Sequence, residues 1–233
     1  MDFYGSGLGD RLIDESLFPS EIKEFLRGED LLLEQCISSF DSLIEVGCMR
    51  GRYLQWAIDR VRNYFGIDIV SSYIEMGRER LGGICTGSLK CDFVLGDAED
   101  IDILLDWKAL GADPQKVLLF FPFNSFGNMQ DFLPVIRSIK KSGARFFIST
   151  YSTIPGATLC RQRYYEACSY LELEKVEDNR GVTFISRDGL RTIAYHPDFL
   201  VEAFKKEGML VDVISFADIG IAYSSPNVFI VKS

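Results

Sequence analysis

Residues 44–51 of the chain read IEVGCMRG. This stretch carries the strongest fold signal, because a short apolar segment at residues 42–46 runs directly into a glycine turn and a helical pattern follows at 52–61. Gly47 lets the backbone turn tightly and approach a ligand, and the following helix offers unpaired N–H groups. Asp68 ends the next apolar segment about twenty residues later, where a carboxylate can accept both hydroxyls of a ribose. The pattern predicts a nucleotide-binding turn in an α/β sheet.

Short apolar segments alternate with amphipathic ones along most of the chain, which predicts a mainly parallel sheet covered by helices. The final two strands are joined without a helix and should pair antiparallel. Helices are expected over 20–27 (with Gly28 as the stop signal), 30–39, 52–61, 72–82, 129–142, 157–170 and 197–207. Strands are expected over 42–46, 63–68, 91–95, 116–121, 144–150, 209–216 and 227–232.

Two cofactor classes use such a turn, dinucleotides and S-adenosylmethionine. The dinucleotide fingerprint G-x-G-x-x-G is absent from the strand end. The turn instead resembles the first motif of class I S-adenosylmethionine-dependent methyltransferases, E/D-x-G-x-G-x-G, with Met49 replacing the middle glycine. GIDI at 66–69, LGDAE at 95–99 and FPFNSFGN at 121–128 resemble later motifs of this family in the same order. The resemblance covers 41–150 and implies an α/β, Rossmann-like, doubly wound, mainly parallel seven-stranded sheet with a C-terminal antiparallel hairpin.

The resemblance also implies a set of cofactor residues. Asp68 would accept the ribose hydroxyls, Asp97 would receive the adenine amino group, and Tyr4 is a candidate lid. Each acid also fits a plainer role, since Asp68 can be a loop acid or helix cap and Asp97 an N-cap. The expected S-adenosylmethionine-binding residues are Tyr4, Glu45, Gly47, Cys48, Gly51, Asp68, Ile69, Asp97, Ala98 and Phe121.

Residues 151–195 depart from the regular alternation and mix Tyr, Arg and Glu side chains, which suits an orienting pocket. Asn124, after the fourth strand, either borders the acceptor or satisfies loop backbone groups. His196, the only histidine, begins a helix and is expected to cap or pack. No catalytic group is assigned, because an amine acceptor needs no dedicated base. The candidate acceptor-pocket residues are Asn124, Tyr151, Arg163 and Tyr165.

The composition limits the partners. The chain has 233 residues, 47% hydrophobic and 25% charged, as in a soluble globular protein. Its formal net charge of −9 disfavours nucleic acid. No apolar run reaches the ~20 residues of a membrane span, and no secretory signal begins the chain. Six cysteines without paired spacing and a single histidine predict no metal site and a reducing cytoplasm. We expect a cytoplasmic monomer or homodimer.

Four regions are expected: an N-terminal helical arm or lid (1–40), a cofactor-binding core (41–150), an insertion forming a substrate lid (151–195), and a C-terminal helix with an antiparallel strand pair (196–233). The resemblance implies methyl transfer from S-adenosylmethionine to N or O of a small molecule. The alternatives are a protein or RNA acceptor, and a cofactor-binding subunit without activity, which Met49 keeps open. An NAD(P)-dependent oxidoreductase would need the missing glycine triplet.

Overall fold

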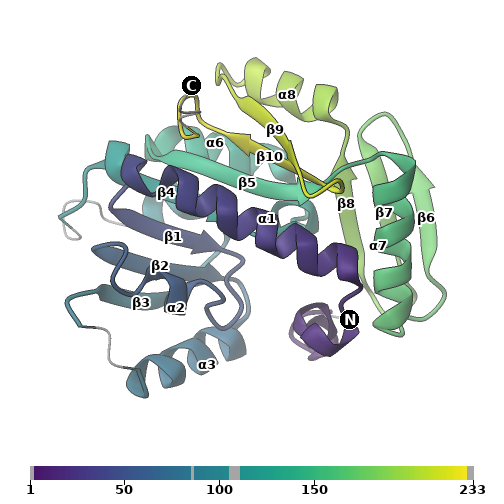
Figure 1. Ribbon diagram of the computed structural model, residues 1–233, viewed down its shortest axis with the longest axis horizontal. Coiled ribbons are helices and arrows are strands. Elements are labelled where there is room, and N and C mark those ends of the chain that lie inside the picture. The colour runs from purple at the N-terminus through teal and green to yellow at the C-terminus, as the bar shows by residue number, and fades with distance from the viewer. Residues whose placement is uncertain (1–2, 85–86, 105–110, 230–233) are drawn as a thin grey trace.

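The computed structural model describes residues 3–84, 87–104 and 111–229. Its centre is a seven-stranded sheet in the order β3-β2-β1-β4-β5-β10-β9 (Figure 1). The strands from β3 to β5 are parallel, and β10 is antiparallel to both β5 and β9, which confirms the expected fold class. The strands are β1 (Ser42–Val46), β2 (Asn63–Asp68), β3 (Lys90–Leu95), β4 (Val117–Phe121), β5 (Arg145–Tyr151), β9 (Asp212–Phe216) and β10 (Gly220–Ser224).

Helices cover both faces of this sheet, because successive side chains of a strand point to opposite faces. In β1, Ile44 and Val46 face the core that α6 and α8 complete. Leu43 faces the opposite core, which α1, α2 and α3 cover. The helices are α1 (Ser20–Cys36), α2 (Leu54–Ala57), α3 (Ser71–Gly82), α4 (Ile101–Leu104), α6 (Phe132–Ser142) and α8 (Pro197–Lys206).

The first helix corrects one expectation. Two helices separated at Gly28 were expected over 20–27 and 30–39, but α1 is continuous through this glycine and ends in a single 3₁₀ turn at Ile37–Ser39. A Cβ at Gly28 would lie 2.6 Å from Cδ2 of Phe216, so the glycine permits close packing against β9 rather than ending the helix.

The C-terminal hairpin also differs from the expectation. The last strand was expected at 227–232, but β10 is the buried segment Gly220–Ser224 between β5 and β9. Residues 227–229 form a turn and bend, and 230–232 lie outside the described residues. Val228 and Phe229 are apolar because they pack on the core beside α1. Apolar character was therefore a correct sign of burial there and an incorrect sign of a strand.

Two expected helices are shorter in the structure. The helix expected at 52–61 is the single turn α2, and the one expected at 129–142 begins at Phe132. Asp131 caps α6 by accepting a hydrogen bond from the backbone N–H of Leu133. The five parallel strands agree with their expected bounds to within one residue.

A second, smaller unit stands beside the main sheet (Figure 1). It consists of α7 (Pro155–Ala167) and an antiparallel sheet of β6 (Glu174–Glu177), β7 (Gly181–Ile185) and β8 (Arg191–Tyr195). The N-terminal segment, residues 3–18, packs against this unit through a largely aromatic core. The Tyr164 hydroxyl donates to the carbonyl of Leu12 at 2.6 Å, and the Tyr170 hydroxyl to that of Leu8 at 3.1 Å.

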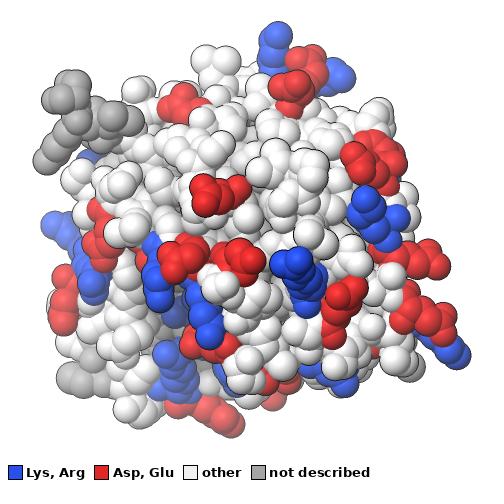
Figure 2. Space-filling view, turned by 45° about the vertical axis from the view of Figure 1, so that its right-hand side comes forward, with Lys and Arg blue, Asp and Glu red and all other residues white. Residues whose placement is uncertain are grey.

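Charges of both signs share the surface. On the face shown in Figure 2, Lys and Arg side chains are interspersed with Asp and Glu side chains. Within the described part of the chain, no helix combines the length and apolar character needed to cross a membrane.

Candidate functional site

A cavity of about 790 Å³ opens at the carboxyl ends of the parallel strands. The residues just after β1, β2, β3 and β4 line it, and so does Tyr151 at the end of β5. Open α/β sheets bind their ligands at this edge, because the loops that follow neighbouring strands converge there. The N-terminal segment, α3, α7 and β8 also contribute lining residues.

The turn after β1 has left-handed backbone at three alternating positions. Gly47 has φ +73°, Met49 +48° and Gly51 +79°. Met49 therefore adopts the backbone region that a glycine would occupy, although this region costs an L residue roughly 1–2 kcal/mol. The Met49 N–H donates to Oδ2 of Asp68 at 2.8 Å, which joins this turn to the end of β2.

The two glycines have different neighbours. Gly47 lines the cavity, and a Cβ there would lie 2.8 Å from Cβ of Ser125 in the loop after β4. Gly51 is not among the described residues that line the cavity, and a Cβ on it would lie 2.5 Å from Cζ of Phe93. Gly51 thus allows close packing against Phe93, and its expected contact with the cofactor stays a prediction.

Asp68 and Asp97 both reach the cavity. Asp68 is 8% exposed, and its carboxylate accepts from the backbone N–H groups of Met49 and of Val70, the latter at 3.0 Å. Burial raises the pKa of Asp68, and these backbone bonds oppose the rise. Asp97 caps a 3₁₀ turn by accepting from the N–H of Glu99 at 3.0 Å. The cap role and the cavity position are therefore compatible, since a carboxylate has about four acceptor sites.

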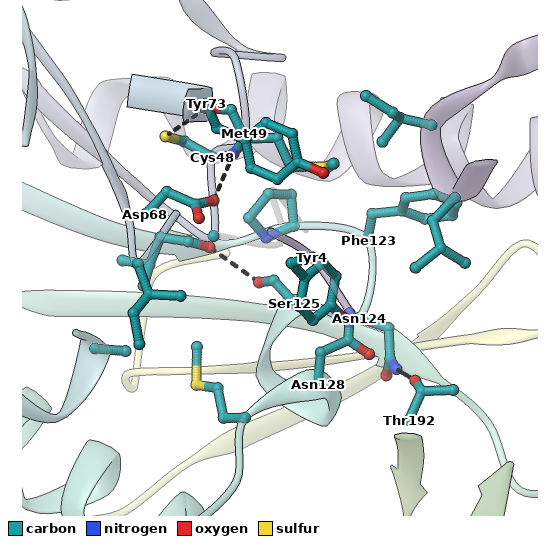
Figure 3. Close-up of a pocket in the computed structure, with 18 of the residues that line it drawn as sticks. Tyr4, Cys48, Met49, Asp68, Tyr73, Phe123, Asn124, Ser125, Asn128 and Thr192 are labelled. Carbon is teal, nitrogen blue, oxygen red and sulfur yellow. Dashed lines mark hydrogen bonds between the residues drawn. The ribbon is translucent and has the colours of Figure 1, made fainter. Parts of the chain in front are cut away.

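Tyr4 lies between the two ends of the cavity. Figure 3 shows Asp68 and Met49 on one side of the pocket and Asn124 and Thr192 on the other. Burial raises the pKa of Tyr4, and the nearby Tyr165 hydroxyl and Asp68 carboxylate raise it further. The Tyr4 hydroxyl is buried and has no hydrogen-bond partner among the described residues. A buried hydroxyl of this kind has an unused donor for a ligand.

Other expected cofactor residues divide into two groups. Ile69, 65% exposed after β2, and the buried Ala98 after β3 line the cavity. Glu45 and Cys48 line it as well. Phe121 does not appear among the described lining residues, because it shares the parity of Val117 and Leu119 in β4 and points into the core beside α6 and α8.

A buried carboxylate that the sequence analysis missed connects two loops of the site. Oε1 of Glu29 accepts from the Tyr53 hydroxyl at 2.6 Å, and Oε2 accepts from the Phe123 N–H at 2.7 Å. Tyr53 follows the glycine turn, and Phe123 belongs to the loop after β4. The sequence did contain a signal for this buried acid. Glu29 falls on the face of α1 whose other buried residues are Ile22, Phe25, Leu26, Leu32, Leu33 and Cys36.

Glu45 and Arg52 form the charged wall beside the glycine turn. Glu45 is fully buried, accepts from the Tyr53 N–H at 3.0 Å and also from the Tyr64 hydroxyl. Burial raises the pKa of Glu45 to about 7, against the opposing effects of these bonds and of the Arg52 charge. Arg52 lines the cavity and lies 5.9 Å from the ring centres of both Tyr53 and Phe123. Its positive charge lowers the pKa of both Glu29 and Glu45, against the effect of burial.

Asn124 lines the cavity but makes its hydrogen bonds within the protein. Its Nδ2 donates to Oγ1 of Thr192 at 3.0 Å and to the carbonyl of Ile193 at 3.2 Å. Its Oδ1 accepts from the Thr150 hydroxyl, and its φ of +59° is left-handed. These contacts favour the structural alternative for Asn124, in which its amide joins the loop after β4 to β8.

The tyrosines of the expected acceptor pocket are at the cavity, but Arg163 is not. Tyr151, Tyr164 and Tyr165 all line it. Arg163 is exposed on α7, and the expectation that it faces the pocket is wrong. The reason is helical phase, because the buried face of α7 carries Arg161, Tyr164 and Tyr165 and leaves position 163 on the solvent side. His196 precedes α8, and its Nδ1 lies 2.9 Å from Oγ1 of Thr153.

Comparisons with known proteins identify the fold. No protein-family model and no curated protein sequence matches the chain. A methyltransferase from Aquifex aeolicus, described as dependent on S-adenosylmethionine, has a similar structure with a TM-score of 0.60 and 14% identity, over 95% of this chain and 97% of that one. The 1,6-didemethyltoxoflavin-N1-methyltransferase of Burkholderia thailandensis, with its acceptor and S-adenosylhomocysteine bound, gives 0.57 and 11% over 87% and 77%.

The glycopeptide N-methyltransferase MtfA bound to S-adenosylhomocysteine gives a TM-score of 0.55 at 14% identity, over 85% of this chain and 86% of that one. These proteins act on different acceptors according to their descriptions, so the structural similarity identifies the fold and does not identify the acceptor. The chain has the class I fold of S-adenosylmethionine-dependent methyltransferases.

Proposed function

We propose that the protein is an S-adenosylmethionine-dependent methyltransferase that acts on a small molecule. The observation that carries this proposal is the cavity at the sheet edge, in which the glycine turn, Asp68 and Asp97 occupy one end and tyrosines occupy the other. Its volume of about 790 Å³ lies in the range of small-molecule sites, roughly 300–1,000 Å³. Macromolecular acceptors usually need an open surface, whereas this cavity is walled by the N-terminal segment and α7.

In this proposal, the residues at the polar end hold the cofactor. Asp68 accepts the ribose hydroxyls, while Asp97 and the backbone of Ala98 bind the adenine. Gly47 allows close approach of the backbone, and the Arg52 guanidinium binds the carboxylate of the methionine part. The unpaired Tyr4 hydroxyl then finds its partner on the bound molecule, with residues 3–18 as the lid.

In this reaction the protein mainly orients the acceptor relative to the methyl group. When bound, the cofactor supplies a methyl group on a positively charged sulfur, and transfer is an in-line displacement. The aromatic end, with Tyr151, Tyr164 and Tyr165, would hold the acceptor atom, N or O, near this methyl group and exclude water. We assign no general base, because an acceptor that reaches the site as a neutral amine or an anion has a free electron pair.

The surface and the thiols support the remaining parts of the proposal. The net charge of −9 and the mixed charges in Figure 2 favour a small acceptor over RNA. Cys36, Cys48, Cys160 and Cys168 are buried thiols, which fits a reducing cytoplasm. We propose a cytoplasmic monomer or homodimer with the core at 41–150, lids at 1–40 and 151–195, and a C-terminal completion of the core at 196–233.

Calorimetric titration with S-adenosylmethionine, S-adenosylhomocysteine and NAD tests the proposal directly. We expect binding of the first two, with the demethylated product at least as tight, and no heat with NAD. Binding of NAD alone would replace the proposal with the oxidoreductase alternative. Binding of neither class would leave a protein that has this fold without its cofactor, and the proposal would fail.

A further inference from the structure

Arg161, in α7, is an unusual charge for a protein interior. The side chain is 0% exposed, and none of the ion pairs found among the described residues includes it. Its Nη1 donates to the carbonyl of Val182 at 3.0 Å and its Nη2 to that of Thr192 at 3.3 Å, while its Nε is buried without a partner. Fully buried arginines are normally paired with an acid, since an uncompensated charge in a low-dielectric interior is costly.

This charge lies directly behind the wall of the cavity. The guanidinium carbon is 5.2 Å from the ring centre of Tyr151 and 5.7 Å from that of Tyr165, and both rings line the cavity. Thr192, whose carbonyl holds Nη2, lines it as well. Arg161 is therefore about one ring away from the space that an acceptor would fill, where few water molecules can screen its field.

The charged residues differ between the two ends of the cavity. The cofactor end carries both signs, with the acids Glu45, Asp68, Asp97 and Glu99 and the arginines Arg50, Arg52 and Arg80. Arg191, at the start of β8, lines the opposite end, where Arg161 adds its buried charge. Glu15, which lines the cavity from the N-terminal segment, and Arg191 are both exposed to solvent and therefore strongly screened, whereas Arg161 is buried.

The walls at the arginine end are flat and apolar. Phe123, Tyr151, Tyr164 and Tyr165 come from three separate elements and place their rings around the same space. Phe123 lies 6.3 Å from Tyr151 and 6.1 Å from Tyr164, centre to centre. Such a set of rings favours a planar ligand, which can stack on one ring and meet the edge of another.

We propose that the acceptor is a ring-bearing small molecule that carries a carboxylate, with the negative charge held at the Tyr151 and Tyr165 end of the cavity. This inference rests on the proposed methyltransferase function and adds the chemical class of the acceptor. The charge of Arg161 acts through the two rings and favours an anion over a neutral isostere of the same shape. Arg161 is thus a specificity-determining residue that need not touch the acceptor.

The test compares three probes of one size on the protein saturated with S-adenosylhomocysteine: benzoate, benzamide and benzylamine. We expect benzoate to bind at least about tenfold more tightly than benzamide, and benzylamine to bind more weakly still. Isothermal titration at low salt measures the three dissociation constants. Salt should weaken the preference only if solvent reaches the charge, so a buried charge predicts little change up to about 0.5 M salt.

Two arginines of the same helix provide a matched pair. Arg161→Met should remove the preference for benzoate over benzamide while leaving S-adenosylhomocysteine affinity within about threefold. Arg163→Met makes the same change on the exposed face of α7 and should leave both measurements as in the parent. Circular dichroism establishes that each variant is folded, and Arg161→Lys, which retains the charge, should retain part of the preference.

The parent protein alone can overturn the inference. Equal or tighter binding of benzamide or benzylamine, or no binding of benzoate at millimolar concentration, would contradict it even if Arg161→Met fails to fold. Such a result together with tight S-adenosylhomocysteine binding would leave the proposed function intact. If S-adenosylhomocysteine does not bind, the proposed function fails, and the three probes are then compared on the protein alone, since Arg161 is present without a cofactor.

Discussion

At the end of the cavity formed by the loops after β1, β2 and β3, acidic side chains accept hydrogen bonds from backbone amides. At the other end, the N-terminal segment, α7 and the second sheet bring aromatic rings together from distant parts of the chain. The first end owes its geometry to hydrogen bonds within and between the loops that follow adjacent strands, and the second to packing. Substitutions at the polar end should therefore change cofactor affinity, and those at the aromatic end acceptor preference.

The largest effect is expected from Asp68→Ala. Losing a carboxylate that accepts charge-assisted bonds should weaken S-adenosylhomocysteine binding by about ten- to a hundredfold, or about 1.5–3 kcal/mol, measured by titration calorimetry. Asp113→Ala is the matched control, because Asp113 also accepts from the N–H two residues on, that of Gln115, at the same 3.0 Å as Asp68 and Val70. Asp113 is exposed and is not among the described lining residues. Unchanged affinity in Asp68→Ala would place the ribose elsewhere.

Glu29 is where the two ends meet, so its replacement probes whether they are independent. Glu29→Leu leaves the buried Phe123 N–H without its acceptor, which should lower the free energy of unfolding by about 1–3 kcal/mol. Asp30→Leu is the control, since Asp30 also lies 2.9 Å from the Tyr53 hydroxyl, and without Asp30 this hydroxyl still has Glu29 as an acceptor. Urea denaturation measures both. Equal losses in the two variants would assign the effect to Tyr53 alone.

The polar end should also respond to pH through Glu45. Burial raises its pKa from 4.5 to about 7, so the folded protein binds this proton more tightly than the unfolded chain does. This contribution to stability is fully present below pH 4.5 and is lost as pH rises through about 7. Between these limits the parent should lose about 2–3 kcal/mol relative to Glu45→Gln, which does not titrate there. Urea midpoints at four pH values measure the difference, and parallel curves for the two proteins would contradict the raised pKa.

The polar end was largely predictable from sequence because its signals are local. Gly47, Asp68 and Asp97 each follow a short apolar strand, and the structure brings all three to one cavity. The errors have specific causes. Phe121 was assigned to the site although its strand parity directs it into the core, and Gly51 was assigned although a Cβ there would meet Phe93 and the glycine is not among the described lining residues. Glu29 was visible as an acid in an apolar stripe and was overlooked.

The aromatic end was less predictable because it depends on helical phase and on long-range packing. The sequence placed arginine and tyrosine side chains in residues 151–195 but could not show that Arg161 faces inward and Arg163 outward, since both faces of α7 carry polar and apolar residues. The contact between Tyr164 and Leu12 joins residues 152 positions apart, and no local pattern encodes it. The last strand was mispredicted for the same reason. An earlier apolar segment, β10, pairs with β5, whereas Val228 and Phe229 are buried by packing on the core.

The smallest effect is expected from Met49→Gly, which tests whether the missing glycine matters. Met49 already has a left-handed φ of +48°, so glycine would relieve roughly 1–2 kcal/mol of backbone strain. Glycine also gains freedom in the unfolded chain, which offsets about 0.4–1 kcal/mol of that relief, so stability should rise by at most about 1.5 kcal/mol. Asp59→Gly, at φ +65° and away from the cavity lining, should show a similar change in stability.

Because the Met49 N–H bond to Asp68 uses only the backbone of Met49, the affinity of Met49→Gly for S-adenosylhomocysteine should stay within about threefold of the parent. A gain of tenfold or more, confined to Met49→Gly and absent from Asp59→Gly, would instead mean that the methionine side chain obstructs the polar end, and that this protein retains the fold with a weakened cofactor turn.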